Sequence, residues 1–187
     1  MSYNFNDQLE QDSKEYSYGK SQYFKFEEGD NKVRILSPGI VVGQHYLGKN
    51  TKPAVCVGEK EGCPHHGDNL PPARPQWMLY LWNYKAENVQ QARMPYTVMQ
   101  SLAKLQNHPE YKFDDLPMPY DITIVAVNAG TKEVQYTVMP ARQNSDIPEK
   151  CQEQFAKKKP IQEVVDGMRL KSVNLDEDDL DVSKIPF

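Results

Sequence analysis

Residues 76–84, which read Gln-Trp-Met-Leu-Tyr-Leu-Trp-Asn-Tyr, are an apolar and aromatic-rich run that predicts a strand. Successive side chains of a strand point to opposite faces of its sheet. One face of this strand would carry an apolar set, Trp77, Leu79 and Leu81. The other face would carry an aromatic set, Tyr80, Trp82 and Tyr84. The aromatic face is either buried as well, as in strands covered on both sides, or an exposed platform on which unpaired bases stack. The sequence of this strand alone does not decide between a buried and an exposed aromatic face.

Similar patterns predict the other elements. Alternating runs bounded by Gly, Pro, Asn and Asp predict strands over residues 23–36, 39–47, 89–94, 121–127 and 132–139, the first interrupted by a turn at Gly29-Asp30-Asn31. Apolar residues at helical spacing predict an amphipathic helix over residues 95–106. Residues 147–158 and 160–170 are also expected to be helical. Five or so short strands, with one helix between the third and the fourth, fit an OB-type Greek-key barrel. The expected fold class is therefore mainly β.

The chain divides into a body and two polar ends. Residues 1–20 are polar, have no clear period and are expected to form a flexible arm. Residues 21–146 would form the barrel, residues 147–173 a helical extension and residues 174–187 a flexible acidic tail. A loop-rich insertion, residues 48–75, makes up most of a small subdomain at about residues 45–75. Such long loops are uncommon in a compact domain unless they carry a function or an internal staple.

The formal net charge is −4, which by itself argues against a nucleic-acid partner. The acidic excess lies in the two ends, however, and a neutral body can still hold a local basic stripe. The first residues do not have the pattern of a signal peptide, and no segment approaches the length of a membrane span. Three Cys, an odd number, argue against a closed disulfide framework. We therefore expect a cytoplasmic protein, in which a Cys cluster is more often a metal site.

Four residues of this subdomain have the spacing of metal ligands. They follow the pattern His-x10-Cys-x6-Cys-x2-His and are His45, Cys56, Cys63 and His66. Zinc prefers four tetrahedral N and S ligands, and a Cys-x2-ligand pair lets one tight turn present two donors. His65 is a possible substitute for His66, and free Cys beside surface His is the alternative to a metal site. Four ligands would indicate a closed structural zinc site.

Several segments together resemble the single-stranded DNA-binding, helix-destabilising proteins of T-even phages. They are residues 24–36 (Phe-Lys-Phe-Glu-Glu-Gly-Asp-Asn-Lys-Val-Arg-Ile-Leu), the His/Cys cluster before Trp77, residues 120–124 (Tyr-Asp-Ile-Thr-Ile) and residues 136–140 (Tyr-Thr-Val-Met-Pro). The resemblance implies sequence-independent binding of single-stranded DNA in phage replication, recombination or repair, in the host cytoplasm. It also implies one zinc held by a His and three Cys; here His66 stands in place of the last Cys. The family's basic N-terminal segment has no counterpart in residues 1–20.

The C-terminal end is similar to that of bacterial single-stranded DNA-binding proteins, which close an acidic run with Ile-Pro-Phe to recruit repair and replication enzymes. The corresponding residues here are Asp178, Asp179, Asp181, Ile185, Pro186 and Phe187. A terminal carboxylate and an aromatic ring suit a basic-rimmed apolar pocket, while acidic residues steer the approach. The alternative is an end with no binding role.

On this hypothesis the expected base-stacking residues are Tyr46, Tyr80, Trp82 and Tyr84. The expected phosphate-binding residues are Lys25, Lys32, Arg34, Lys52 and Arg93. The alternatives are core positions for the aromatic residues and ordinary solvated positions for the basic ones. Two other functions compete: a protein-interaction adaptor built on an OB barrel, and a zinc hydrolase, which would need an open coordination position. RNA is also a possible target.

Overall fold

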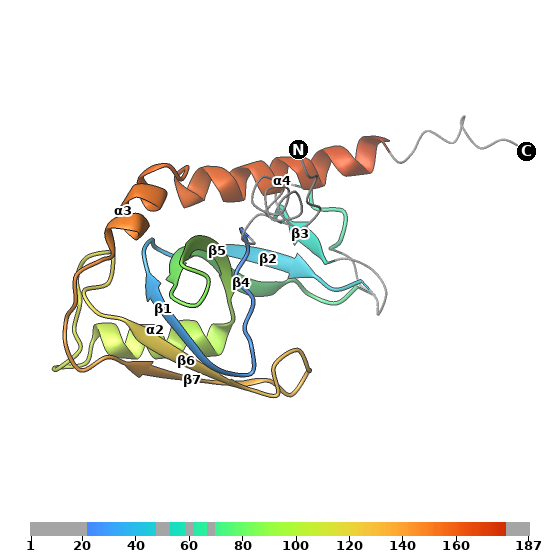
Figure 1. The fold of residues 1–187 in the computed structure, drawn as a ribbon. Helices are drawn as coiled ribbons and strands as arrows, with labels where there is room; N and C mark the ends of the chain where they lie inside the picture. Colours follow the sequence, from blue (N-terminus) through green and yellow to red (C-terminus); the bar gives the residue numbers. More distant parts are fainter. Residues whose placement is uncertain (1–21, 48–52, 59–61, 67–69, 179–187) are drawn as a thin grey trace, which may run out of the picture.

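The computed structural model describes residues 22–47, 53–58, 62–66 and 70–178 (Figure 1). Seven antiparallel strands form one sheet, in the order β3-β2-β4-β1-β6-β7 with β5 also paired to β4. The strands are β1 Gly29–Ile35, β2 Ile40–His45, β3 Ala54–Cys56, β4 Arg74–Asn83, β5 Asn88–Met94, β6 Ile122–Val127 and β7 Gln135–Pro140. The helices are α2 Tyr96–Gln106, α3 Glu149–Ala156 and α4 Ile161–Asp178. The described chain is thus a mixed α/β structure around an antiparallel sheet.

β4 is the central strand. One of its edges pairs with β5 from Trp77↔Met94 to Asn83↔Asn88. The other edge is shared, because β2 pairs with the first half of β4 and β1 with the last residues. Three strands therefore depend on the position of β4.

The alternation predicted for β4 is confirmed, and both of its faces are buried. Leu79 and Leu81 belong to a core that the side chains of α2, including Val98 and Leu102, help to form. Tyr80 and Trp82 belong to a second core on the opposite face. Helices α3 and α4 close this second core and lie together on one side of the sheet in Figure 1. The sheet is thus a middle layer between α2 and the pair α3–α4.

Most predicted elements are present, with three differences. The part of the first predicted strand that precedes the turn, residues 23–28, is reduced to a single bridge between Tyr23 and Gln91. The predicted turn at Gly29-Asp30-Asn31 is instead the start of β1, where the Asn31 amide donates hydrogen bonds to the carbonyls of Glu27, Gly29 and Ile124. A short strand, β3, also lies within the predicted loop insertion.

Helix α4 ends at Asp178, so residues 174–178 of the predicted acidic tail are helical. Among the described strands, no pairing closes the sheet into a barrel. The OB-type barrel therefore stays a prediction, and the antiparallel sheet is its confirmed part. No helix of the described segments is both long enough and apolar enough to cross a membrane.

Candidate metal centre and nucleic-acid surface

The four predicted metal ligands converge in space. One ligand atom from each of His45, Cys56, Cys63 and His66 lies within 4.8 Å of all the others. The Cys56 Sγ lies 3.1 Å from His66 Nε2, and the Cys63 Sγ lies 3.6 Å from His45 Nε2. Zinc bond lengths of 2.0–2.3 Å place tetrahedral ligand atoms roughly 3.3–3.8 Å apart. The residues present therefore fit a tetrahedral ion, and the cluster could hold a metal such as zinc.

Local backbone structure explains this convergence. His45 ends β2, and β3 pairs beside it with Gly43 opposite Cys56. A Cβ on Gly43 would lie 2.8 Å from the Cys56 Cβ, so glycine permits this close approach. The Cys63 N–H donates to the Gly58 carbonyl at 3.1 Å, and the His66 N–H donates to the Cys63 carbonyl at 3.4 Å. A tight turn therefore presents the last two ligands together.

The surroundings also favour particular nitrogen atoms as metal ligands. The His45 Nδ1 lies 3.4 Å from the Pro71 carbonyl, which suits an N–H at Nδ1 and leaves Nε2 free for a metal. His65 is not one of the four clustered residues, although its ring centroid lies 5.6 Å from that of His45. Of the two alternatives, the geometry therefore favours His66 as the fourth ligand.

Two predicted stacking residues are in the second core. Tyr80 and Trp82 are each only 2% exposed. They pack with Cys151 of α3 and with Ile161 and Val165 of α4. The prediction of an exposed stacking face is wrong for Tyr80 and Trp82, because the helical extension covers their rings.

Three further predicted DNA contacts converge on Asp121. Arg34 is fully buried and donates from Nε to the Asp121 Oδ1 at 2.7 Å. The Tyr84 hydroxyl donates to the same oxygen at 2.7 Å. The Lys32 Nζ lies 3.1 Å from the Asp121 Oδ2 and 4.4 Å from the centroid of the Tyr84 ring. Arg34 also donates to the Ser145 carbonyl, so its predicted phosphate contact is wrong and it instead ties the sheet to the segment before α3.

This network sets the protonation of its members. Burial alone would raise the pKa of Asp121, but hydrogen bonds from Tyr84, Lys32 and Arg34 more than offset it and leave that pKa lowered. Burial, and then the hydrogen bond to Asp121, strongly raise the pKa of Tyr84. Asp121 is thus a buried carboxylate in the folded protein, and Tyr84 stays a neutral donor.

The remaining predicted residues are exposed or lie outside the described segments. Lys25, Tyr46 and Arg93 are exposed. Lys52 lies outside the described residues, as do the predicted partner-binding residues Asp179, Asp181, Ile185, Pro186 and Phe187. Asp178 is the last residue of α4.

Tyr46 belongs to a group that we call the Tyr46 surface, which consists of the exposed residues Tyr46, Arg74 and Arg93 and the half-buried Gln76. The Arg74 guanidinium lies 5.5 Å from the centroid of the Tyr46 ring, and the Gln76 amide donates to the Tyr46 hydroxyl at 3.1 Å. Strand register places Arg93 opposite Met78, on the face that Arg74 and Gln76 share. Within the described segments, neither Arg74 nor Arg93 has an ion pair. The candidate metal ligand His45 directly precedes Tyr46.

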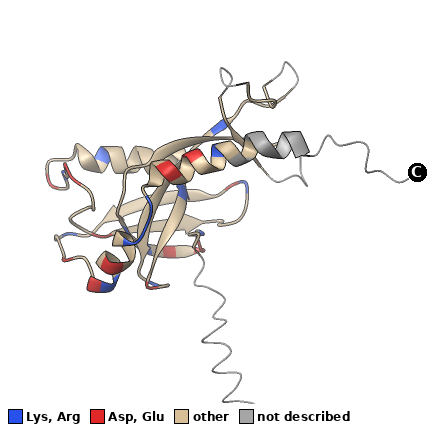
Figure 2. Cartoon of the chain, turned by 90° about the horizontal axis from the view of Figure 1, so that it is seen from above, with Lys and Arg blue, Asp and Glu red and all other residues tan. Residues whose placement is uncertain are grey.

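Sequence reasoning missed Arg74 and Gln76 in this group. Their even numbering places them on the same face of β4 as Met78 and Tyr80, so the alternation used for residues 76–84 could have found them. Beyond this group, Figure 2 shows Lys and Arg interspersed with Asp and Glu over the described chain. The basic residues of the Tyr46 surface are therefore a small local set.

Comparisons of the chain with protein-family models, curated proteins and solved structures give no match.

Proposed function

We propose that this chain is a non-catalytic, sequence-independent binder of single-stranded DNA, acting in phage replication, recombination or repair. Its body would be an OB-type barrel stapled by one zinc ion. The observation that carries the proposal is the Tyr46 surface, an exposed aromatic ring with two arginines on the same face of the sheet. Stacking on such a ring is worth about 1–3 kcal/mol per base and tolerates any base.

The metal would act as a structural staple in this proposal. Four protein ligands fill the tetrahedral shell of zinc, as in closed structural sites. The ion would join the ends of β2 and β3 to the turn at residues 63–66 and so hold Tyr46 in place. A hydrolase needs an open coordination position, and the four-residue cluster supports the structural role over this alternative.

Fluorescence anisotropy with a labelled single-stranded oligonucleotide and a matching duplex tests the proposal directly. The wild type is expected to bind the single strand in preference and to weaken as salt rises. Tyr46→Ala should lose about 1–3 kcal/mol of affinity. Arg74→Ala should lower the salt slope by about 0.7 if its phosphate contact is lost.

Lys104→Ala is the matched control, because Lys104 is an exposed cation on α2, outside the Tyr46 surface. It should leave both affinity and salt slope unchanged. Binding of neither nucleic acid by folded, zinc-loaded protein would reject the proposal and favour the adaptor. Equal losses of DNA affinity in Arg74→Ala and Lys104→Ala would reject the Tyr46 surface as the binding site. The same titration with an RNA strand of the same sequence compares the affinity of the protein for RNA with its affinity for DNA.

The proposal includes docking of replication or repair proteins at the acidic C-terminal end. Ile185, Pro186 and Phe187 would supply the apolar tip and the carboxylate, and the preceding acidic residues would steer the approach. These three residues lie outside the described segments, so this part of the proposal is supported by the sequence similarity alone.

A further inference from the structure

Residues 112–119 form a loop that is hollowed on several sides and lies away from the Tyr46 surface. A cavity of about 370 Å³ opens between this loop and α2, and its walls include the apolar side chains of Ile35, Leu79, Met99, Leu102, Phe113 and Met118. A second cavity of about 570 Å³ lies between the loop and residues 144–147. Both volumes lie in the range of about 300–1,000 Å³ typical of binding pockets.

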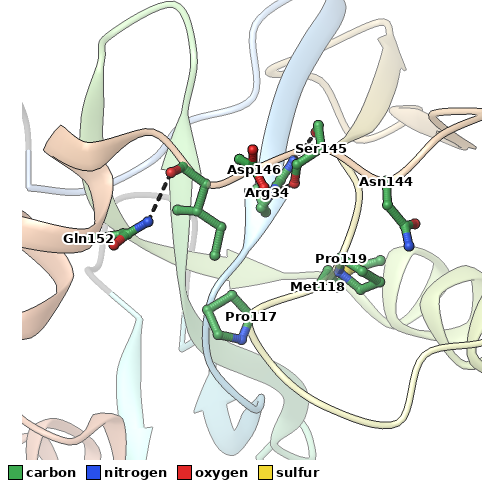
Figure 3. A pocket seen from close by; sticks show the side chains of 9 residues that line it. Arg34, Pro117, Met118, Pro119, Asn144, Ser145, Asp146 and Gln152 are labelled. Atoms are coloured by element: carbon green, nitrogen blue, oxygen red, sulfur yellow. Dashed lines mark hydrogen bonds between the residues drawn. The ribbon is translucent and has the colours of Figure 1, made fainter.

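The cavities adjoin one another along the loop. Met118 lines both of them, and a third hollow of about 320 Å³ shares Phe113 and Asp114 with the first and Pro117 with the second. Figure 3 shows Pro117 and Met118 on the wall of the second cavity, opposite Gln152 of α3. A row of hollows suits an extended chain whose side chains enter successive pockets, rather than one small ligand.

The loop is held in place by the sheet, so these hollows are already formed. The Met118 N–H donates to the Ile35 carbonyl at 2.9 Å, and the Ser145 N–H donates to the Pro119 carbonyl at 3.1 Å. The Tyr120 hydroxyl donates to the Tyr111 carbonyl at 2.5 Å. A ligand would therefore bind without first ordering this segment.

The charges around the hollows determine which partner fits. Asp114 and Asp115 line the first cavity, and Asp146 lines the second. Of the basic residues at these walls, Arg34 pairs with Asp121 and Lys112 pairs with Asp114. Asp115 and Asp146 have no ion pair within the described segments. The uncompensated charge is negative, which repels a nucleic-acid backbone and attracts a cation.

We propose that the surface around residues 112–119 docks an extended segment of a partner protein in which apolar side chains alternate with Lys or Arg. The apolar side chains of the partner would enter the cavity beside α2 and the two adjoining hollows. Its basic side chains would face Asp115 and Asp146. This proposal does not depend on the binding of single-stranded DNA. It assigns a protein partner to a part of the molecule remote from the Tyr46 surface.

Methyl NMR of protein labelled at the methionine methyl groups gives a direct test. The probe is acetyl-Lys-Leu-Lys-Phe-Lys-amide, and the control peptide is acetyl-Glu-Leu-Glu-Phe-Glu-amide. The cationic peptide should shift the Met99 and Met118 signals saturably and should bind at least several-fold more tightly than the acidic peptide. Met78 and Met168 belong to the second core and should not move.

Two variants separate the site from the fold. Ala103 is an exposed residue of α2 that lines the first cavity, so Ala103→Phe should block the peptide without disturbing either core. Ala156→Phe makes the same change at an exposed position of α3 outside these cavities and should bind normally. Asp115→Asn should weaken the cationic peptide several-fold, and the loss should shrink as salt is added.

Several outcomes would overturn the proposal. These are no shift of the Met99 and Met118 signals at millimolar peptide, equal shifts of these signals with both peptides, or equal loss of peptide binding in Ala103→Phe and Ala156→Phe. Shifts of Met99 and Met118 caused by a single-stranded oligonucleotide, and not by the peptide, would assign the surface to nucleic acid instead. Failure of DNA binding at the Tyr46 surface would leave all of these readouts unaffected.

Discussion

Arg34 and Lys32 approach the carboxylate of Asp121 from two positions of β1, but only Arg34 is buried. Arg34→Met should lower the free energy of unfolding by about 3–5 kcal/mol, because it leaves a buried charge without its main partner. Lys32→Met should cost at most about 1 kcal/mol, because the Lys32 side chain is 55% exposed. Urea unfolding of both variants at pH 7 measures the difference. Similar losses in the two would contradict this account of the network.

His65 and His66 provide a second comparison at the same scale, since adjacent histidines differ in whether they join the metal cluster. Zinc-loaded wild type should contain one zinc per chain. His66→Ala should bind zinc much more weakly in competition with a chelator, because one of four ligands is lost. His65→Ala should match the wild type. Metal analysis after dialysis against the chelator gives the result, and the reverse order of the two variants would move the fourth ligand to His65.

The helices α3 and α4 decide the role of the aromatic face of β4. Fully burying one large apolar side chain contributes about 1.5–3 kcal/mol, which is comparable to stacking one base, about 1–3 kcal/mol. Several apolar side chains of the two helices pack on this face, including Cys151, Ile161 and Val165. Uncovering Tyr80 and Trp82 would therefore cost more than stacking on them returns. If the protein binds single-stranded DNA as proposed, this balance favours contacts at the uncovered end of β4.

Two residues of α4 test how much this cover contributes to stability. Ile161 is 6% exposed and packs in the second core, whereas Leu170 is 66% exposed on the same helix. Ile161→Ala should destabilise the protein by about 2–5 kcal/mol. Leu170→Ala should change stability by no more than about 0.5 kcal/mol. Thermal or urea unfolding distinguishes them, and an unchanged Ile161→Ala variant would mean that α4 is not firmly packed.

For the whole molecule, the lowered pKa of Asp121 links folding to pH. A carboxyl group whose pKa is lower in the folded state stabilises the fold fully at pH values above its pKa in the unfolded chain, about 3.9. This stabilisation is lost as the pH falls through the pKa of the folded state. The wild type should therefore exceed Asp121→Asn in unfolding free energy by a constant amount at neutral pH. The gap should narrow as pH falls below about 3.9. A gap independent of pH down to acid unfolding would contradict the role of Asp121.

Part of this structure was accessible from the sequence because its signals are local. The alternation in residues 76–84 places the side chains of β4 on their correct faces. The His/Cys spacing identifies all four clustered residues. Both patterns lie within short continuous stretches, residues 76–84 and residues 45–66, so they can be recognised without reference to distant segments.

The remainder depended on contacts between distant parts of the chain. Arg34 has the pattern of a solvated strand residue, and its partner Asp121 lies 87 positions away. One missed signal was available: Ile161, Val164, Val165 and Met168 have the spacing of an amphipathic helix, which needs an apolar face to cover. The aromatic face of β4 is the surface that they cover. A predicted amphipathic helix with no assigned packing surface therefore argues against leaving an aromatic sheet face of the same chain exposed.

The shared position of β4 has a consequence for engineering the protein. A peptide tag inserted within β4 or β5 would disturb both cores, because these two strands carry side chains for each of them. The turn after β6 is different: Gly130 is exposed, and its surroundings leave open space around it. Exposed turns of this kind are where proteins tolerate insertion best. A fluorescent reporter segment placed after Gly130 would therefore leave the metal cluster, the Tyr46 surface and both cores intact.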